Sequence, residues 1–108
     1  MNIINVPNGQ GKTEYIIRKS ANENLPIIVS NIHRKNGIKA RALEIGVRVD
    51  VYTVHEFMHA HGIFTRDTKI LIDDLDLVLA EFVGFEVDTA TCSIKYTDID
   101  VLKQGDIN

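Results

Sequence analysis

The sequence has a single cysteine, Cys92, in 108 residues. One cysteine excludes a disulfide bond within the chain, and such scarcity is typical of proteins from a reducing cytosol. A surplus of positive charge is also missing, because the formal net charge is −3. The overall charge therefore provides no general attraction to nucleic acid or to an anionic membrane, although it is compatible with a local basic patch.

Long apolar runs are missing too. No run approaches the roughly 20 apolar residues that a helix needs to cross a bilayer. The polar, glycine-rich stretch 9–13 interrupts the N-terminal region before any long apolar run, so we expect no signal peptide. We therefore expect a cytoplasmic protein with no membrane partner. The length fits a single domain over 1–108, and the composition, 44% hydrophobic and 25% charged, is that of an ordinary folded chain.

Apolar β-rich runs alternate with helical patterns along the chain. Strands are expected at 2–6, 26–30, 48–54, 69–73 and 86–94, and helices at 12–22, around 40–45, at 56–61 and at 75–82. Gly46 and Gly84 are expected to end two of the helices, and 100–108 to hold one helical turn. This alternation predicts βαβ units. The expected fold is α/β, a single three-layer domain with a mainly parallel sheet of about five strands.

The first expected strand leads into the loop Pro-Asn-Gly-Gln-Gly-Lys-Thr at 7–13, and a helix follows. This is the setting of the phosphate-binding loop G-x-x-x-x-G-K-[ST], although Val6 stands where the first glycine belongs. Glycines let the backbone turn tightly, so that several N–H groups and the start of the helix can face one phosphate. The residues expected to bind a nucleotide are Asn8, Gly9, Gln10, Gly11, Lys12 and Thr13.

Two side chains of the loop have specific expected roles. Lys12 would reach the β- and γ-phosphates, and the hydroxyl of Thr13 would bind Mg²⁺. The alternative is a glycine-rich turn with a surface lysine.

The run Lys-Ile-Leu-Ile-Asp-Asp at 69–74 is an apolar strand that ends in two acids. In P-loop enzymes such a strand ends beside the phosphate loop, and its aspartate holds the Mg²⁺ shell. Asp73 would do this directly or through water. Asp74 would polarise the attacking water, which makes Asp74 and Lys12 the catalytic candidates and Thr13 and Asp73 the metal candidates. The alternative is a solvated strand end.

The loop at 9–13 together with Ile72-Asp73-Asp74 resembles the additional-strand class of P-loop NTPases, and among them the N-terminal core of superfamily 1 helicases. Val29-Ser30-Asn31, followed by Arg34 and Lys35, is similar to their segment that touches single-stranded DNA. Thr53-Val54-His55 is similar to their T-x-H element.

The resemblance extends to a later strand with polar sensor residues, a place that Thr89, Thr91 and Ser93 would fill. The sequence also departs from the family. The acidic strand ends Asp-Asp instead of Asp-Glu, and no second RecA-like domain supplies an arginine finger. The resemblance therefore implies a reduced P-loop protein, such as a phage or another mobile element encodes.

Two hypotheses for the function stay open. In the first, the domain binds ATP or GTP with Mg²⁺, hydrolyses it weakly or with help from a partner or a second copy in a homo-oligomer, and serves DNA replication or recombination. In the second, it is a non-catalytic module on the same scaffold. It would then dock on a host or replication protein through its basic segment or its acidic C-terminal half.

A remote third hypothesis comes from His55-Glu56-Phe57-Met58-His59, which spells the zinc-hydrolase motif H-E-x-x-H. On one long helix, His55 and His59 could bind zinc, with Glu56 as general base. However, Gly62 would end that helix early, and Thr65 stands where a third histidine is expected. Histidines on a short exposed helix are the alternative.

Further candidates lie in 32–48, which concentrates basic residues. They could contact a phosphate backbone, and a solvated helix face is the alternative. These residues are His33, Arg34, Lys35, Lys39, Arg41 and Arg48. We expect Cys92 to be buried and inert, and all four phenylalanines (Phe57, Phe64, Phe82 and Phe85) to lie in the core and not to stack on bases.

Overall fold

The computed structural model describes residues 1–5, 11–60, 64–65, 67–93 and 95–98. The chain forms two compact units, one of Met1–Lys12 with Thr89–Asn108 and one of Thr13–Asp88. Each unit has a parallel sheet of its own. The single domain over 1–108 stays a prediction.

The larger unit is an α/β unit with a three-stranded parallel sheet. Its strands are β2 (Ile27–Val29), β3 (Val51–Thr53) and β4 (Leu71–Ile72), in the order β3-β2-β4. Four helices accompany them: α1 (Lys12–Glu23), α2 (Ile32–Ile45), α3 (Val54–Met58) and α4 (Leu75–Val83). The central strand β2 is fully buried at all three positions, as expected of a parallel strand that is covered on both faces.

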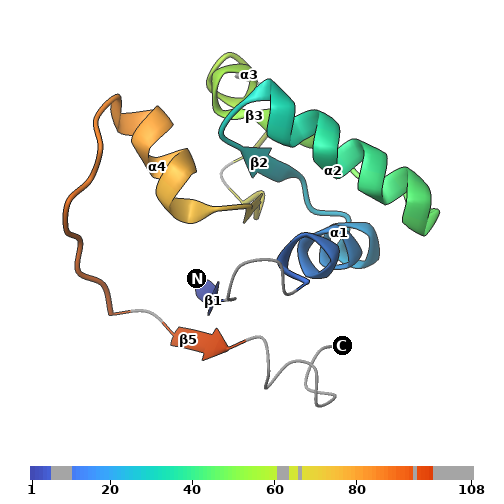
Figure 1. Ribbon diagram of the computed structural model, residues 1–108, viewed down its shortest axis with the longest axis horizontal. Helices are drawn as coiled ribbons and strands as arrows, with labels where there is room; N and C mark the ends of the chain where they lie inside the picture. The colour runs from blue at the N-terminus through green and yellow to red at the C-terminus, as the bar shows by residue number, and fades with distance from the viewer. Residues whose placement is uncertain (6–10, 61–63, 66, 94, 99–108) are drawn as a thin grey trace. The chain divides into compact units, whose positions relative to one another are not determined.

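Alternate residues of β2 pack in two separate clusters, one on each face of the sheet. On one face, Ile27 and Val29 pack with Ile17 of α1 and Ile38 of α2. On the other face, Ile28 packs with residues of α3 and α4. Figure 1 shows α2 and α4 on opposite sides of β2. The unit is therefore a three-layer arrangement, as predicted, but around three strands.

Local signals in the sequence set the ends of the helices. Asn31 caps α2, since its side chain accepts a hydrogen bond from the Arg34 N–H at 3.1 Å. Gly46 ends α2 with φ 86°, and Gly84 ends α4 with φ 83°. Both adopt the left-handed conformation that glycine reaches without strain, so the two predicted helix ends are confirmed.

In the smaller unit, β1 (Asn2–Asn5) pairs in parallel with β5 (Lys95–Asp98). The predicted five-stranded sheet is therefore wrong, because the strands form a three-stranded sheet and a separate pair. The predicted strand at 86–94 is also wrong over 86–93, which is described and not a strand. Its β-branched residues resemble a strand, but a strand also needs a hydrogen-bonded neighbour.

Three smaller expectations have different outcomes. Cys92 is exposed, so the prediction that it is buried is wrong. The helical turn expected at 100–108 lies outside the described residues. Of the helices in the described part of the chain, none is both long and apolar enough to cross a membrane.

Candidate functional site

Polar residues gather where the three strands of the larger sheet end. Because β3, β2 and β4 are parallel, their carboxyl ends share one edge, which carries Thr53, Ser30 and Asp73. All three residues are buried, and Asp73 is only 4% exposed. The Asp73 N–H donates to the Ile28 carbonyl at 3.1 Å, which fixes the start of the β4–α4 connection against β2. The edge thus combines a buried carboxyl group with two hydroxyl groups.

The connections that leave β2 and β4 diverge at this edge. The helix after β2, α2, packs on the face that carries Ile27 and Val29, whereas the helix after β4, α4, packs on the face that carries Ile28. In open α/β sheets, ligands bind beyond the carboxyl ends of neighbouring strands whose connections diverge in this way. Ser30 and Asp73 lie directly after these two strands. The topology therefore marks this edge as the candidate site.

An ion pair joins the two diverging connections. Arg34, in the first turn of α2, donates a hydrogen bond from Nη1 to Oδ2 of Asp74, at the start of α4. The side chain of Asp74 is 12% exposed, so its charge is largely removed from water. Asp74 also has φ 59° and ψ 74°, a left-handed conformation that costs a non-glycine residue energy, although aspartate tolerates it better than most. Such strained positions are concentrated at functional sites.

A second network anchors the end of β3. The Glu56 N–H donates to Thr53 Oγ1 at 3.1 Å, and the Thr53 N–H donates to Glu56 Oε1 at 2.9 Å, which forms a capping box at the start of α3. Lys35 Nζ lies 2.9 Å from both carboxylate oxygens of Glu56. The hydrogen bond from the Thr53 backbone and then the one from Lys35 lower the pKa of Glu56 below its ordinary value.

This network bears on the zinc hypothesis, because Glu56 already caps a helix and pairs with a lysine. α3 ends at Met58, so His55 lies within it and His59 follows its last residue. The two imidazole rings lie 4.3 Å apart between centroids, and Nδ1 of His59 lies 2.8 Å from the His55 carbonyl oxygen. Among the described residues, no group of three or more histidine, cysteine or acidic side chains could hold a metal ion. Gly62 lies outside the described residues.

The predicted phosphate loop is only partly described. Asn8, Gly9 and Gln10 lie outside the described residues. Gly11 has φ 86°, a conformation that favours glycine, and α1 begins with Lys12 and Thr13.

Residues 13–23 of α1 belong to the larger unit, whereas Lys12 belongs to the smaller one. A short connection joins the end of α1 to the start of β2, and Ile17 of α1 packs in the same cluster as Ile27 and Val29. The helix α1 therefore lies on the same face of the sheet as α2.

Most of the described basic residues of α2 form ion pairs with acidic side chains. Besides Arg34 and Lys35, Arg41 pairs with Glu44 at 2.8 Å and with Glu14 at 3.6 Å. The balanced charges favour the solvated helix face over a contact with a phosphate backbone. The pairing of Arg34 with Asp74 was not predictable from spacing, since 40 residues separate the partners.

The remaining predicted positions differ from expectation. Thr89, Thr91 and Ser93 lie in the described stretch that is not a strand, so their placement on one is wrong. Phe57 and Phe64 are half-buried with ring centroids 5.2 Å apart, and Phe57 packs against the cluster around Ile28. Phe82 and Phe85 are 46% and 76% exposed, so their assignment to the core is wrong.

No protein-family model, curated protein or solved structure matches the chain.

Proposed function

We propose that the protein binds ATP or GTP together with Mg²⁺ at the carboxyl edge of the β3-β2-β4 sheet, and that it hydrolyses the nucleotide weakly. One observation carries the proposal: α2 and α4 diverge from neighbouring strands at the point where the buried Asp73 lies. Divergence of this kind is typical of ligand sites in open α/β sheets. The sequence G-x-G-K-T at 9–13 supports phosphate as the group to be bound.

The residues present fit Mg²⁺, which prefers oxygen ligands from one or two carboxylates and from the phosphates of its substrate. Asp73 would supply the carboxylate, and Thr13 would supply a hydroxyl group from the first turn of α1. Lys12 and the backbone of Asn8, Gly9, Gln10 and Gly11 would hold the phosphates. The metal would neutralise charge on the β- and γ-phosphates.

The state of Asp74 supports weak hydrolysis. A carboxylate oxygen that accepts a hydrogen bond from a guanidinium is occupied by that contact and is less able to orient a water molecule. Arg34 makes this contact with Asp74. Asp74 would therefore polarise the attacking water only after Arg34 has moved away, a change that the γ-phosphate or a partner could drive by attracting the guanidinium.

The proposal is tested by calorimetric titration of Mg-ATP into the wild type and the Lys12→Ala variant. Loss of a charge-assisted hydrogen bond to phosphate should weaken binding about 10- to 100-fold. Lys39→Ala is the matched control, because Lys39 is exposed on α2 outside the loop, and its affinity should equal that of the wild type. No binding by the wild type, or equal affinity in all three proteins, would contradict the proposal.

A second candidate function keeps the scaffold without hydrolysis, as a module that docks on a replication or host protein. The observation that favours it is the Arg34–Asp74 ion pair, which occupies the residue that would otherwise act on water. Single-stranded DNA is a weaker candidate partner, since acidic side chains already neutralise several cations of α2. Retention of the same partner by immobilised protein with and without ATP would favour the module, whereas retention only with ATP would favour a nucleotide switch.

A further inference from the structure

The surface around α4 is apolar where a solvent-exposed helix is usually polar. Leu75, Leu79, Phe82 and Val83 follow the i, i+4, i+7, i+8 spacing of one helix face. The buried residue of α4 is Val78, whereas Phe82 and Val83 are 46% and 51% exposed. The large apolar side chains exposed on α4 and just after it are Leu75, Leu77, Phe82, Val83, Phe85 and Val87. Exposed apolar side chains gathered in this way often mark a contact surface.

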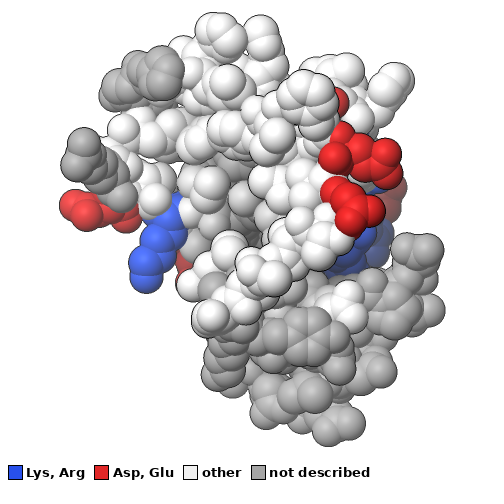
Figure 2. Space-filling model, turned by 90° about the vertical axis from the view of Figure 1, so that its left-hand side faces the viewer, with Lys and Arg blue, Asp and Glu red and all other residues white. Residues whose placement is uncertain are grey.

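The charged residues in this part of the chain have one sign. Residues 70–94 contain six acidic residues and no lysine, arginine or histidine. Four of the six lie among the exposed apolar positions: Asp76, Glu81, Glu86 and Asp88, all of them exposed. Figure 2 shows the side of the molecule on which α4 lies, where a broad uncharged area has both acidic and basic side chains at its margins. We call these ten residues the acidic-apolar surface.

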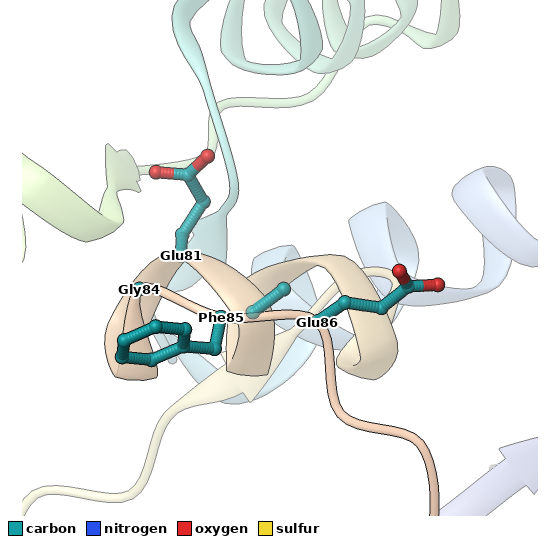
Figure 3. A pocket seen from close by; sticks show the side chains of 5 residues that line it. Glu81, Gly84, Phe85 and Glu86 are labelled. Atoms are coloured by element: carbon teal, nitrogen blue, oxygen red, sulfur yellow. The ribbon is translucent and has the colours of Figure 1, made fainter.

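A shallow pocket lies at the end of α4. Ala80, Glu81, Gly84, Phe85 and Glu86 line a volume of about 360 Å³. In Figure 3 the side chains of Glu81, Phe85 and Glu86 extend from it in three directions. The carbonyl groups at the C-terminus of a helix carry partial negative charge, and a cation is also attracted to the face of an aromatic ring. The two carboxylates do not converge on one point, and each of them favours a lysine or arginine side chain beside it.

We propose that the acidic-apolar surface binds a basic amphipathic segment of a partner protein. The apolar side chains of that segment would cover the stripe of Leu75, Phe82 and Val83, and its lysine or arginine side chains would lie against Glu81 and Glu86. Charge complementarity selects such a segment over an acidic one, because like charges across an interface are strongly unfavourable. The surface requires no nucleotide, so this proposal is independent of the proposed nucleotide site and deepens the second candidate function.

The test measures fluorescence anisotropy of two labelled 14-residue helical peptides without nucleotide. Both carry leucine on one face, and the other face carries lysine in one peptide and glutamate in the other. The wild type should bind the lysine peptide at least tenfold more tightly than the glutamate peptide. Phe85→Ala removes an aromatic contact and should weaken binding of the lysine peptide about tenfold. Leu43→Ala removes an 83%-exposed leucine on α2 and should leave the affinity for this peptide unchanged.

Charge reversal separates this surface from a general attraction to an acidic protein. Glu81→Lys/Glu86→Lys should reverse the preference, so that the glutamate peptide binds more tightly. Glu23→Lys/Glu44→Lys makes the same change in net charge on α1 and α2 and should keep the preference of the wild type. Equal behaviour of the two double variants, or no binding of either peptide, would overturn the proposal.

Sedimentation velocity tests the competing occupant, a second copy of the chain. The wild type should sediment as a monomer under the conditions of the peptide titration. A dimer that Phe85→Ala converts to a monomer would show that the surface pairs with itself, and this result would also overturn the proposal.

Discussion

Removing the Thr53 hydroxyl should loosen the carboxyl end of β3 by a predictable amount. Thr53→Ala deletes the acceptor of the Glu56 N–H and a methyl group at a residue that is 8% exposed. Loss of an N-cap side chain costs about 1 kcal/mol of the free energy of unfolding. A buried methyl group adds about 0.8 kcal/mol. The total, roughly 2 kcal/mol, corresponds to a fall in Tm of about 8 °C, at roughly 4 °C per kcal/mol for a chain of this size.

Thr53→Ser separates the two contributions, because it keeps the hydroxyl and loses only the methyl group. It should cost about 0.8 kcal/mol, so that the serine and alanine variants differ by about 1 kcal/mol, the contribution of the cap. Urea denaturation followed by circular dichroism at neutral pH measures both differences. If the two variants have the same stability, the capping box contributes nothing and the reasoning is refuted.

The same network predicts a dependence on pH. Glu56 has a lowered pKa in the folded state, first through the Thr53 backbone N–H and then through Lys35. Its contribution is therefore present above the unfolded pKa of about 4.3 and is lost as the pH falls through the lower folded pKa. Glu56→Gln keeps an acceptor for Thr53 and loses the charge. Since the side chain is 41% exposed, the pair with Lys35 should be worth under about 1 kcal/mol at neutral pH, and nothing in strong acid. A constant difference at all pH values would contradict this.

Two further matched pairs follow from the structure. Gly37→Ala should stabilise the protein by about 0.5–1 kcal/mol, because Gly37 lies inside α2 with open space at its Cβ position. Gly46→Ala should destabilise the protein by about 1 kcal/mol, because Gly46 has φ 86°. Opposite shifts in Tm would confirm the pair, and shifts of the same sign would contradict it. Ile17→Ala should lower the free energy of unfolding by about 2–5 kcal/mol, since Ile17 is fully buried. Leu43→Ala should lower it by less than about 0.5 kcal/mol, since Leu43 is 83% exposed, and urea denaturation measures both changes. Comparable losses in both would show that burial does not govern these sites.

The sequence predicted best where local patterns determine structure. The apolar run 26–30 indicates a buried strand, and β2 lies within it with Ile27, Ile28 and Val29 fully buried. Gly46 and Gly84 end their helices because a residue after a helix commonly takes the left-handed conformation.

Two signals of the same local kind were available in the sequence and were missed. Asn31 before Ile32 marks the start of α2, which begins earlier than predicted. Thr53 and Glu56 have the T-x-x-E spacing of a capping box, which places the start of α3 at Val54 and inside the expected strand.

Other features depend on distant parts of the chain. The β-branched run 86–94 resembles a strand, but only the arrangement of the sheet decides whether a partner lies beside it. The ion pair between Arg34 and Asp74 and the exposure of Phe82 and Phe85 are likewise set by packing. At the candidate site, the sequence predicted Asp73 as a functional residue. The divergence of α2 from α4 is known only from the fold.

The order β3-β2-β4 has a consequence during synthesis on the ribosome. The central strand β2 is made first, and it gains β3 along one side before β4 exists. Until Leu71 and Ile72 emerge, the other edge of β2 presents unpaired backbone groups, and such an edge can pair with foreign strands. α1, already complete by then, covers only one face of that strand. The nascent chain should therefore be most prone to aggregation in the interval between the synthesis of β3 and that of β4.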